Sequence, residues 1–178
     1  MLYRSLKPLP HIQEQINSFC DKNLRNEPTI GIHVRHGNGE EDDRSHFSSR
    51  VITEFESFID NLVARIDKIA KQKKFTRYKL FLCTDSDQVI LALRARVPNL
   101  LTREIWRPMK NQGVDFDHSF NSPDEGVQSA ANALIDMQLL GKCDVAILTR
   151  PTSFACQVPY LQEIPGASFL TSNDFQQL

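Results

Sequence analysis

Residues 31–39, with the sequence GIHVRHGNG, carry the side chains of this chain that are best suited to binding an anion. Arg35 supplies a permanently charged, planar guanidinium that can hold a phosphate through two hydrogen bonds. Side chains alternate along a strand, so His33 should point to the same face as Arg35. Gly37 and Gly39 would let backbone amides approach a ligand closely. We therefore predict that a phosphate or diphosphate binds where this strand ends.

Each of these side chains also has a purely structural interpretation. Arg35 could form an ion pair with an acid of the following loop, such as Glu40 or Asp43, and His33 could hold only a backbone carbonyl. His36 lies one position further on and should face away from the site or into the loop. The acidic run 40–43 is most simply a solvated loop, although it is also the only nearby source of a general base.

The tripeptide Arg35-His36-Gly37 is also the way strands end in histidine phosphatases and phosphoglycerate mutases, in which this histidine is phosphorylated. Their mechanism needs a second histidine after a later strand, paired with another arginine. The later strands predicted here end in TDS at residues 84–86 and TRP at residues 149–151, and His118 lies in a predicted loop. A phosphatase that uses His36 is therefore the less favoured alternative.

The elements that must position these residues alternate between strands and helices. We predict strands over residues 30–35, 80–84, 100–106, 144–149 and 167–170. We predict long helices over residues 8–24, 51–74 and 122–141, with shorter ones before Pro98 and before Pro159. This alternation is typical of a three-layer, Rossmann-like α/β domain with a mainly parallel sheet. The polar ends of three strands would then share one edge, where such sheets bind ligands.

Three further polar positions follow the predicted strands. Asp85 could cap the next helix, contact a ligand, or do both, because DSDQ approximates a capping box. Thr152 and Ser153 open the connection after the strand at residues 144–149, where hydroxyls and free amides would meet a phosphate. Helix capping is the structural alternative for this pair as well.

Asp136 shares a helical stripe with Ser129 and Asn132. That stripe is either the solvated face of the helix or a face turned toward the site. In the second case, the Asp136 carboxylate could accept the paired N–H donors of a guanine edge.

The length of the chain indicates one domain, and its composition indicates little net charge. The chain has 178 residues and a formal net charge of -1, so nothing in its charge favours nucleic acid or membrane as a partner. Its four cysteines are widely spaced, which argues against a zinc site, and Cys83 and Cys143 should be core residues in a reducing compartment. No segment resembles a leader or a bilayer span. We expect a cytoplasmic protein.

Three segments resemble successive blocks of the α1,6-fucosyltransferases: residues 30–40, 81–86 and 133–137. The tripeptide Pro151-Thr152-Ser153 falls in the place of a fourth block. The chain is more similar to the rhizobial nodulation enzymes, which fucosylate chitin oligosaccharides, than to those that fucosylate the N-glycan core. Order, spacing and residue types agree over nearly the whole chain.

The resemblance implies a GDP-β-L-fucose donor and transfer with inversion to a sugar hydroxyl, without a metal or other cofactor. In the family, the arginine matching Arg35 grips the β-phosphate. The expected donor-binding set is His33, Arg35, His36, Asn38, Asp85, Asp136, Thr152 and Ser153. Within that set, the family assigns an assisting role to His33, guanine recognition to Asp136, and phosphate contact to Thr152 or Ser153. The general base is not identifiable from the residues, and Glu40 is the candidate.

Family members have two facing Rossmann-like domains, the glycosyltransferase-B fold, and the resemblance covers only the second, donor-binding domain. We expect residues 1–178 to be that single domain, without the acceptor-side domain. An inverting transfer needs donor and acceptor held in line. The chain alone should therefore bind GDP-sugar weakly and transfer slowly or not at all, unless a partner domain or a second copy completes the cleft. A non-catalytic GDP-sugar-binding module is the main alternative.

Overall fold

The computed structural model describes residues 7–36, 52, 54–105, 123–149, 154, 155, 157 and 158, together with the backbone of residues 167–170. Its centre is a five-stranded sheet in the order β3-β2-β1-β4-β5, and every neighbouring pair of strands is parallel. The strands are β1 (Thr29–Val34), β2 (Lys79–Thr84), β3 (Leu100–Leu101), β4 (Val145–Thr149) and β5 (Ala167–Leu170). The predicted α/β class with a parallel sheet is confirmed.

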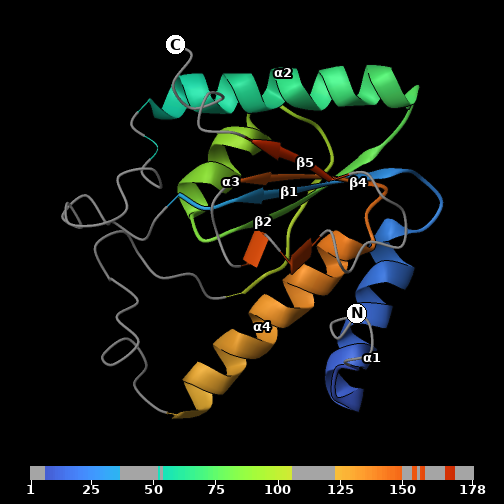
Figure 1. Cartoon of the computed structure of the whole chain (residues 1–178), viewed down its shortest axis with the longest axis vertical. Coiled ribbons are helices and arrows are strands. Elements are labelled where there is room, and N and C mark those ends of the chain that lie inside the picture. The colour runs from blue at the N-terminus through green and yellow to red at the C-terminus, as the bar shows by residue number, and fades with distance from the viewer. Residues whose placement is uncertain are drawn as a thin grey trace.

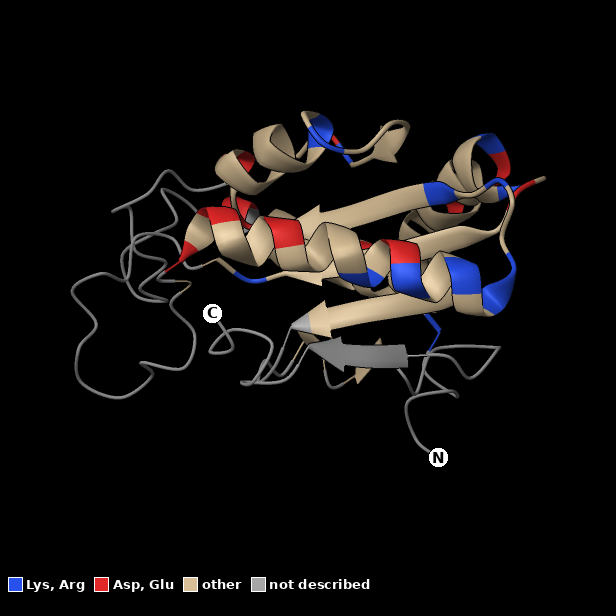
Figure 2. Ribbon diagram, turned by 90° about the horizontal axis from the view of Figure 1, so that it is seen from above, with Lys and Arg blue, Asp and Glu red and all other residues tan. Residues whose placement is uncertain are grey.

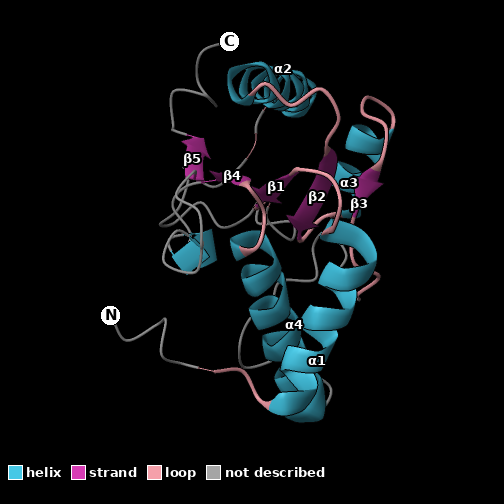
Figure 3. Ribbon diagram, turned by 90° about the vertical axis from the view of Figure 1, so that its right-hand side faces the viewer, coloured by secondary structure: helices cyan, strands magenta, loops and turns pink. Residues whose placement is uncertain are grey.

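Helices cover both faces of the sheet, which gives the predicted three layers (Figures 1 and 3). The helices are α1 (Pro10–Phe19), its π-helical continuation η2 (Cys20–Leu24), α2 (Phe55–Lys73), α3 (Asp87–Arg94) and α4 (Pro123–Gly141). One core cluster joins the sheet to α2 and α3, and the other joins its opposite face to α1 and α4.

The alternation predicted for β1 is confirmed by its neighbours. Ile30, Ile32 and Val34 pack in the cluster formed with α2 and α3. Gly31 lies on the opposite face, against Leu140 of α4 and Cys143 just beyond it. The strand is buried on both sides along its whole length, as expected for the central strand of a parallel sheet.

Helix α2, the longer of the two helices that pack on the face of the sheet shared with α3, illustrates how the sequence specifies a helix. Its buried side chains recur every three or four residues, which places Phe58, Leu62, Ile66 and Ile69 on one stripe. Figure 2 shows acidic residues toward the N-terminal end of α2 and basic residues toward its C-terminal end. This distribution opposes the helix dipole and stabilises both ends.

Two element boundaries differ from the sequence prediction by more than two residues. The third strand is Leu100–Leu101 alone, not residues 100–106. It is an edge strand with one partner, and after Leu101 the chain leaves the sheet toward α4, where Arg103 bonds to Asn132. The helix predicted from residue 51 begins at Phe55.

The close packing of α4 on β1 requires a glycine at position 31. A methyl group on Gly31 would lie 2.9 Å from Cys143 Sγ and 3.0 Å from Leu140 Cδ2. We expect Gly31→Ala to lower the free energy of unfolding by about 1–3 kcal/mol, because an overfilled core must shift. Chemical denaturation measures this change. Adding Cys143→Ala should recover part of the loss, and a Gly31→Ala chain as stable as the wild type would contradict this packing argument.

Candidate functional site

Two of the three polar strand ends lie side by side, as predicted. β1 is paired with β2 on one side and with β4 on the other. Val34 lies opposite Thr84, so the residues that follow, Arg35 and Asp85, leave the sheet at the same point. Of the third polar signature, at residues 149–153, Thr149 ends β4, and residues 150–153 lie outside the described residues.

An ion pair joins these two strand ends. Arg35 Nη1 lies 3.0 Å from Asp85 Oδ2, and Asp85 Oδ1 accepts a hydrogen bond of 2.9 Å from the backbone N–H of His36. The Arg35 side chain is 30% exposed and that of Asp85 is 12% exposed. The carboxylate thus orients Arg35, and the guanidinium is still reached by solvent at the carboxyl edge of the sheet. The sequence prediction placed a structural partner in the loop at residues 40–43, whereas the partner seen here comes from the adjacent strand.

The helix-capping interpretation of Asp85 is wrong. The N-cap of α3 is Ser86, and no side-chain hydrogen bond caps that helix. Asp85 instead directs its carboxylate across the sheet edge to Arg35 and His36, because the register of β1 and β2 brings them together.

His33, two residues before Arg35, is a buried, neutral imidazole. Its side chain is almost fully buried, and its ring stacks on that of Phe154 with centroids 4.6 Å apart. The pKa of His33 is lowered from 6.5 to about 4. Burial is the main cause, the Arg35 charge acts in the same direction, and the Asp85 charge opposes both. His33 can therefore donate one hydrogen bond at neutral pH but carries no charge. Among the described residues at these strand ends, the permanent positive charge belongs to Arg35.

His36 faces away from His33, as predicted for a residue one position beyond Arg35. Its Nδ1 lies 3.0 Å from Ser86 Oγ, and its ring centroid lies 5.0 Å from that of Phe55 at the start of α2. The hydroxyl and the aromatic ring hold the imidazole against the α2 side of the sheet. His118, the other histidine that a phosphatase mechanism could recruit, lies outside the described residues.

Asp136 belongs to the buried side of α4, so the solvated-face interpretation of its stripe is wrong. Asp136 is 9% exposed, and its Oδ1 accepts a hydrogen bond of 2.8 Å from Arg103 Nη1. Cys83 Sγ lies 3.8 Å from the Asp136 carbonyl oxygen, and Cys83 is the register partner of His33. Asp136 therefore lies on the same face of the sheet as His33.

Sequence reasoning missed Arg103 as a member of this region. The residue was assigned to the third strand, and its only signal was a cation two positions after a pair of leucines. Both the Arg103 and Asp136 side chains are 12% exposed. Only the tertiary arrangement, in which α4 passes beside the end of β3, shows that this cation has a buried partner.

The remaining predicted site residues lie outside the described residues. Asn38, Glu40, Thr152 and Ser153 are not among those residues. In the described part of the chain, no group of three or more His, Cys, Asp or Glu side chains is placed to hold a metal ion. Within the same part, no helix is both long and apolar enough to cross a membrane.

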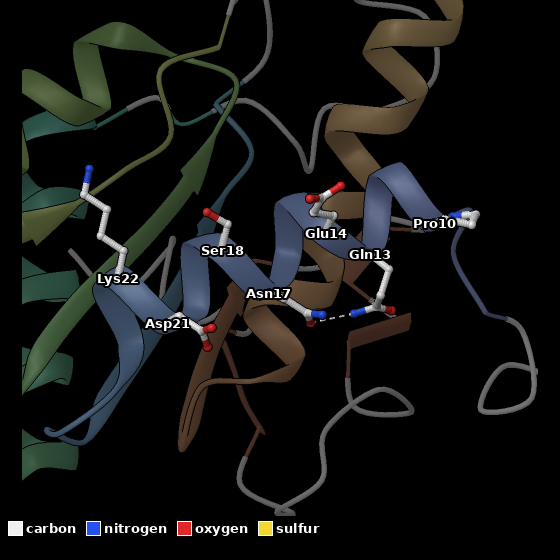
Figure 4. A pocket seen from close by; sticks show the side chains of 7 residues that line it. All are labelled: Pro10, Gln13, Glu14, Asn17, Ser18, Asp21 and Lys22. Atoms are coloured by element: carbon white, nitrogen blue, oxygen red, sulfur yellow. Dashed lines mark hydrogen bonds between the residues drawn. The ribbon is translucent and has the colours of Figure 1, made fainter.

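A surface hollow runs along α1 and the start of η2 (Figure 4). It is lined by Pro10, Gln13, Glu14, Asn17, Ser18, Asp21 and Lys22. None of the candidate residues borders it, and two of its lining side chains, Gln13 and Asn17, share a hydrogen bond of 2.9 Å. The strand ends remain the candidate site.

The neutral state of His33 makes stability depend on pH. Because the folded pKa of about 4 lies below the unfolded value of 6.5, the unfolded chain binds a proton first as pH falls. The contribution of neutral His33 to the free energy of unfolding, about 3 kcal/mol, is fully present above pH 6.5. It is lost progressively as the pH falls from 6.5 to 4. Denaturation curves from pH 4 to 7.5 should show a shallower pH slope for His33→Gln. Exposed His11→Gln is the control, and identical slopes for His33→Gln and wild type would refute the assignment.

Sequence comparisons place this chain in a known family. The family model for nodulation protein Z (NodZ) matches residues 1–164. Nodulation protein Z of Azorhizobium caulinodans is 35% identical over 154 residues, and that of Sinorhizobium fredii is 30% identical over 154 residues. These matches cover 85% of this chain but only 44% and 45% of the relatives, so the chain spans less than half of their length.

Solved structures agree on the fold. A crystal structure of NodZ α1,6-fucosyltransferase soaked with GDP-fucose aligns with a TM-score of 0.62 and 24% identity, over 92% of this chain and 45% of that one. A structure of POFUT1 in complex with GDP-fucose aligns with a TM-score of 0.53 and 12% identity, over 90% of this chain and 46% of that one. Together with the family match, which covers most of the sequence, these findings show that the chain belongs to the nodulation protein Z family.

Proposed function

We propose that this chain is the donor-binding domain of an α1,6-fucosyltransferase and binds GDP-fucose at the carboxyl edge of its sheet. One observation carries the proposal: a partly exposed arginine, held by Asp85, stands at the end of the central strand. Family membership supports it, as does a relative's crystal soaked with GDP-fucose. Ligands of open parallel sheets bind at this edge.

In this proposal, Arg35 binds the β-phosphate of the donor. Its guanidinium can form a bidentate, charge-assisted contact with phosphate oxygens. Negative charge grows on the diphosphate as its bond to the sugar breaks, and a fixed cation stabilises that developing charge. Arg35 would thus neutralise the leaving group without a metal. His33, which is uncharged, would add one hydrogen bond and no charge.

The same proposal includes transfer of fucose with inversion, by direct displacement of GDP. The acceptor hydroxyl attacks the anomeric carbon from the side opposite GDP, and its proton passes to a general base, for which Glu40 is the candidate. The new glycosidic bond forms as the bond to the diphosphate breaks. A chitin oligosaccharide as acceptor and a cytoplasmic location belong to the proposal and stay predictions.

The second candidate is a GDP-sugar-binding module that does not transfer sugar, since the ion pair of Arg35 with Asp85 suits binding of a diphosphate and does not by itself require transfer. Incubation of the chain with GDP-fucose and chitin oligosaccharide, followed by mass spectrometry, separates the two. A fucosylated product supports the transferase. GDP binding without product supports the module. A phosphohistidine at His36 with no GDP binding would instead support the phosphatase.

The phosphate contact is tested by Arg35→Ala. We expect the Kd for GDP, measured by calorimetry, to rise about 10- to 100-fold, because a charge-assisted contact is lost and the Asp85 carboxylate is left without this cation. Adding Asp85→Asn to Arg35→Ala should recover part of that loss, since it removes the charge that would repel phosphate.

Arg77→Ala is the matched control for Arg35→Ala. Arg77 forms an ion pair of 2.8 Å with Glu27 but lies before β2, at the opposite edge of the sheet. It should leave GDP binding unchanged. Equal losses in the Arg35 and Arg77 variants, or no loss in either, would overturn the assignment of the phosphate site.

A further inference from the structure

Positive charge is concentrated at the C-terminal end of α2, at the edge of the sheet opposite the candidate site. Residues 68–79 contain six Lys or Arg and no Asp or Glu. This segment runs from the last turns of α2 to the first residue of β2, and Figure 2 shows the basic end of the helix in blue. The formal net charge of -1 for the whole chain conceals this charge, because acidic residues elsewhere balance it.

Two of the six cations have partners in the fold. Lys79 Nζ donates to the carbonyl oxygens of Asn23 at 2.7 Å and Arg25 at 3.0 Å, and Arg77 pairs with Glu27. The other four are exposed lysines whose side chains form no ion pair or hydrogen bond in the described part of the chain: Lys68, Lys71, Lys73 and Lys74. We call these four residues the lysine cluster.

The helix dipole accounts for only part of this charge. The C-terminus of a helix carries roughly half a negative elementary charge, which one basic residue in the last turn can balance. The acid nearest in sequence, Asp67, precedes the cluster and offsets one further charge. The rest of the cluster is uncompensated, and like charges at such short range repel one another. Folding alone therefore does not require four lysines here.

Lys74 adds its charge at a cost in backbone conformation. It is the C-cap of α2 and adopts the left-handed conformation, with a φ of 58°. Glycine is the usual residue at such a position because it has no Cβ. The cap closes through backbone bonds, from Lys74 N–H to the Lys71 carbonyl at 3.1 Å and from Phe75 N–H to the Ala70 carbonyl at 2.9 Å. A glycine could form the same bonds, so the cap itself does not need the lysine side chain.

The chemistry of the cluster suits a broad anionic surface. Lysine ammonium groups are hydrated point charges on flexible stems, whereas bidentate recognition of a single phosphate needs an arginine. The neighbouring aromatic side chains, Phe75 and Tyr78, pack against the core and provide no platform for stacked bases. The lysines extend from a helix end, and the hollow shown in Figure 4 lies along α1 instead. A bilayer with anionic lipids matches these properties, since each lysine near its surface strengthens binding about fivefold.

We propose that the lysine cluster docks this domain on the surface of a membrane that contains anionic lipids. The contact is electrostatic and peripheral, and it does not depend on the proposed function. The candidate site lies at the other end of β1 and β2, about 17–20 Å away for strands of six residues. Docking through the cluster therefore leaves the carboxyl edge of the sheet open to its ligands.

Co-sedimentation with lipid vesicles tests this proposal. The chain should bind vesicles of phosphatidylcholine mixed with phosphatidylglycerol at low salt, and should not bind phosphatidylcholine alone. High salt should release it, because the charges are then screened. Lys71→Gln should weaken binding about fivefold, and replacing all four lysines of the cluster with glutamine should abolish it. Lys7→Gln, which removes an exposed lysine before α1, is the matched control and should leave binding unchanged.

Lys74→Gly separates docking from folding. It removes one charge and also the left-handed strain, so the Tm should rise while vesicle binding weakens about fivefold. The variant without the four lysines should remain folded and bind GDP with the Kd of the wild type, because the cluster lies at the opposite edge from Arg35.

Three results would overturn the proposal, and none of them bears on the donor site. The first is a wild-type chain that does not sediment with anionic vesicles at low salt. The second is vesicle binding that persists when all four lysines are replaced, since another surface would then be responsible. The third is binding to polyglutamate without binding to vesicles, which would assign the cluster to an acidic protein partner instead.

Discussion

The pairing of β1 with β2 is the constraint on which the candidate site depends. Val34 lies opposite Thr84 in a parallel register, so the next residue of each strand is brought to the same point. One of these residues is Arg35 and the other is Asp85, and their ion pair of 3.0 Å follows from the register. A shift of the register by one residue would move the two charges to different faces of the sheet.

The site balances charge before any ligand binds. Arg35 is paired with Asp85, and Asp136 is paired with Arg103. His33 is neutral because it is buried. Each of these two charged pairs among the described residues is thus internally compensated, and the Arg35 guanidinium is already oriented. Because the Arg35 side chain is already oriented, it loses less conformational entropy when a nucleotide binds.

Much of the fold could be predicted from local patterns. Apolar residues at every second position of β1 and at every third or fourth position of α2 specify which faces are buried. The alternation of strands and helices specifies a parallel sheet, and that sheet places the strand ends along one edge. Local patterns did not predict the length of the edge strand β3, because that length depends on where the chain leaves the sheet toward α4.

The sequence by itself determined the layered α/β architecture, the two-sided burial of the central strand and the position of Arg35 at its end. Only the tertiary structure decided the partners: Asp85 for Arg35, and Arg103 for Asp136. The physical reason is distance along the chain. Periodicity reports which side of an element is buried, but an ion pair between residues 33 or 50 positions apart depends on how separate elements pack, and no local pattern encodes that.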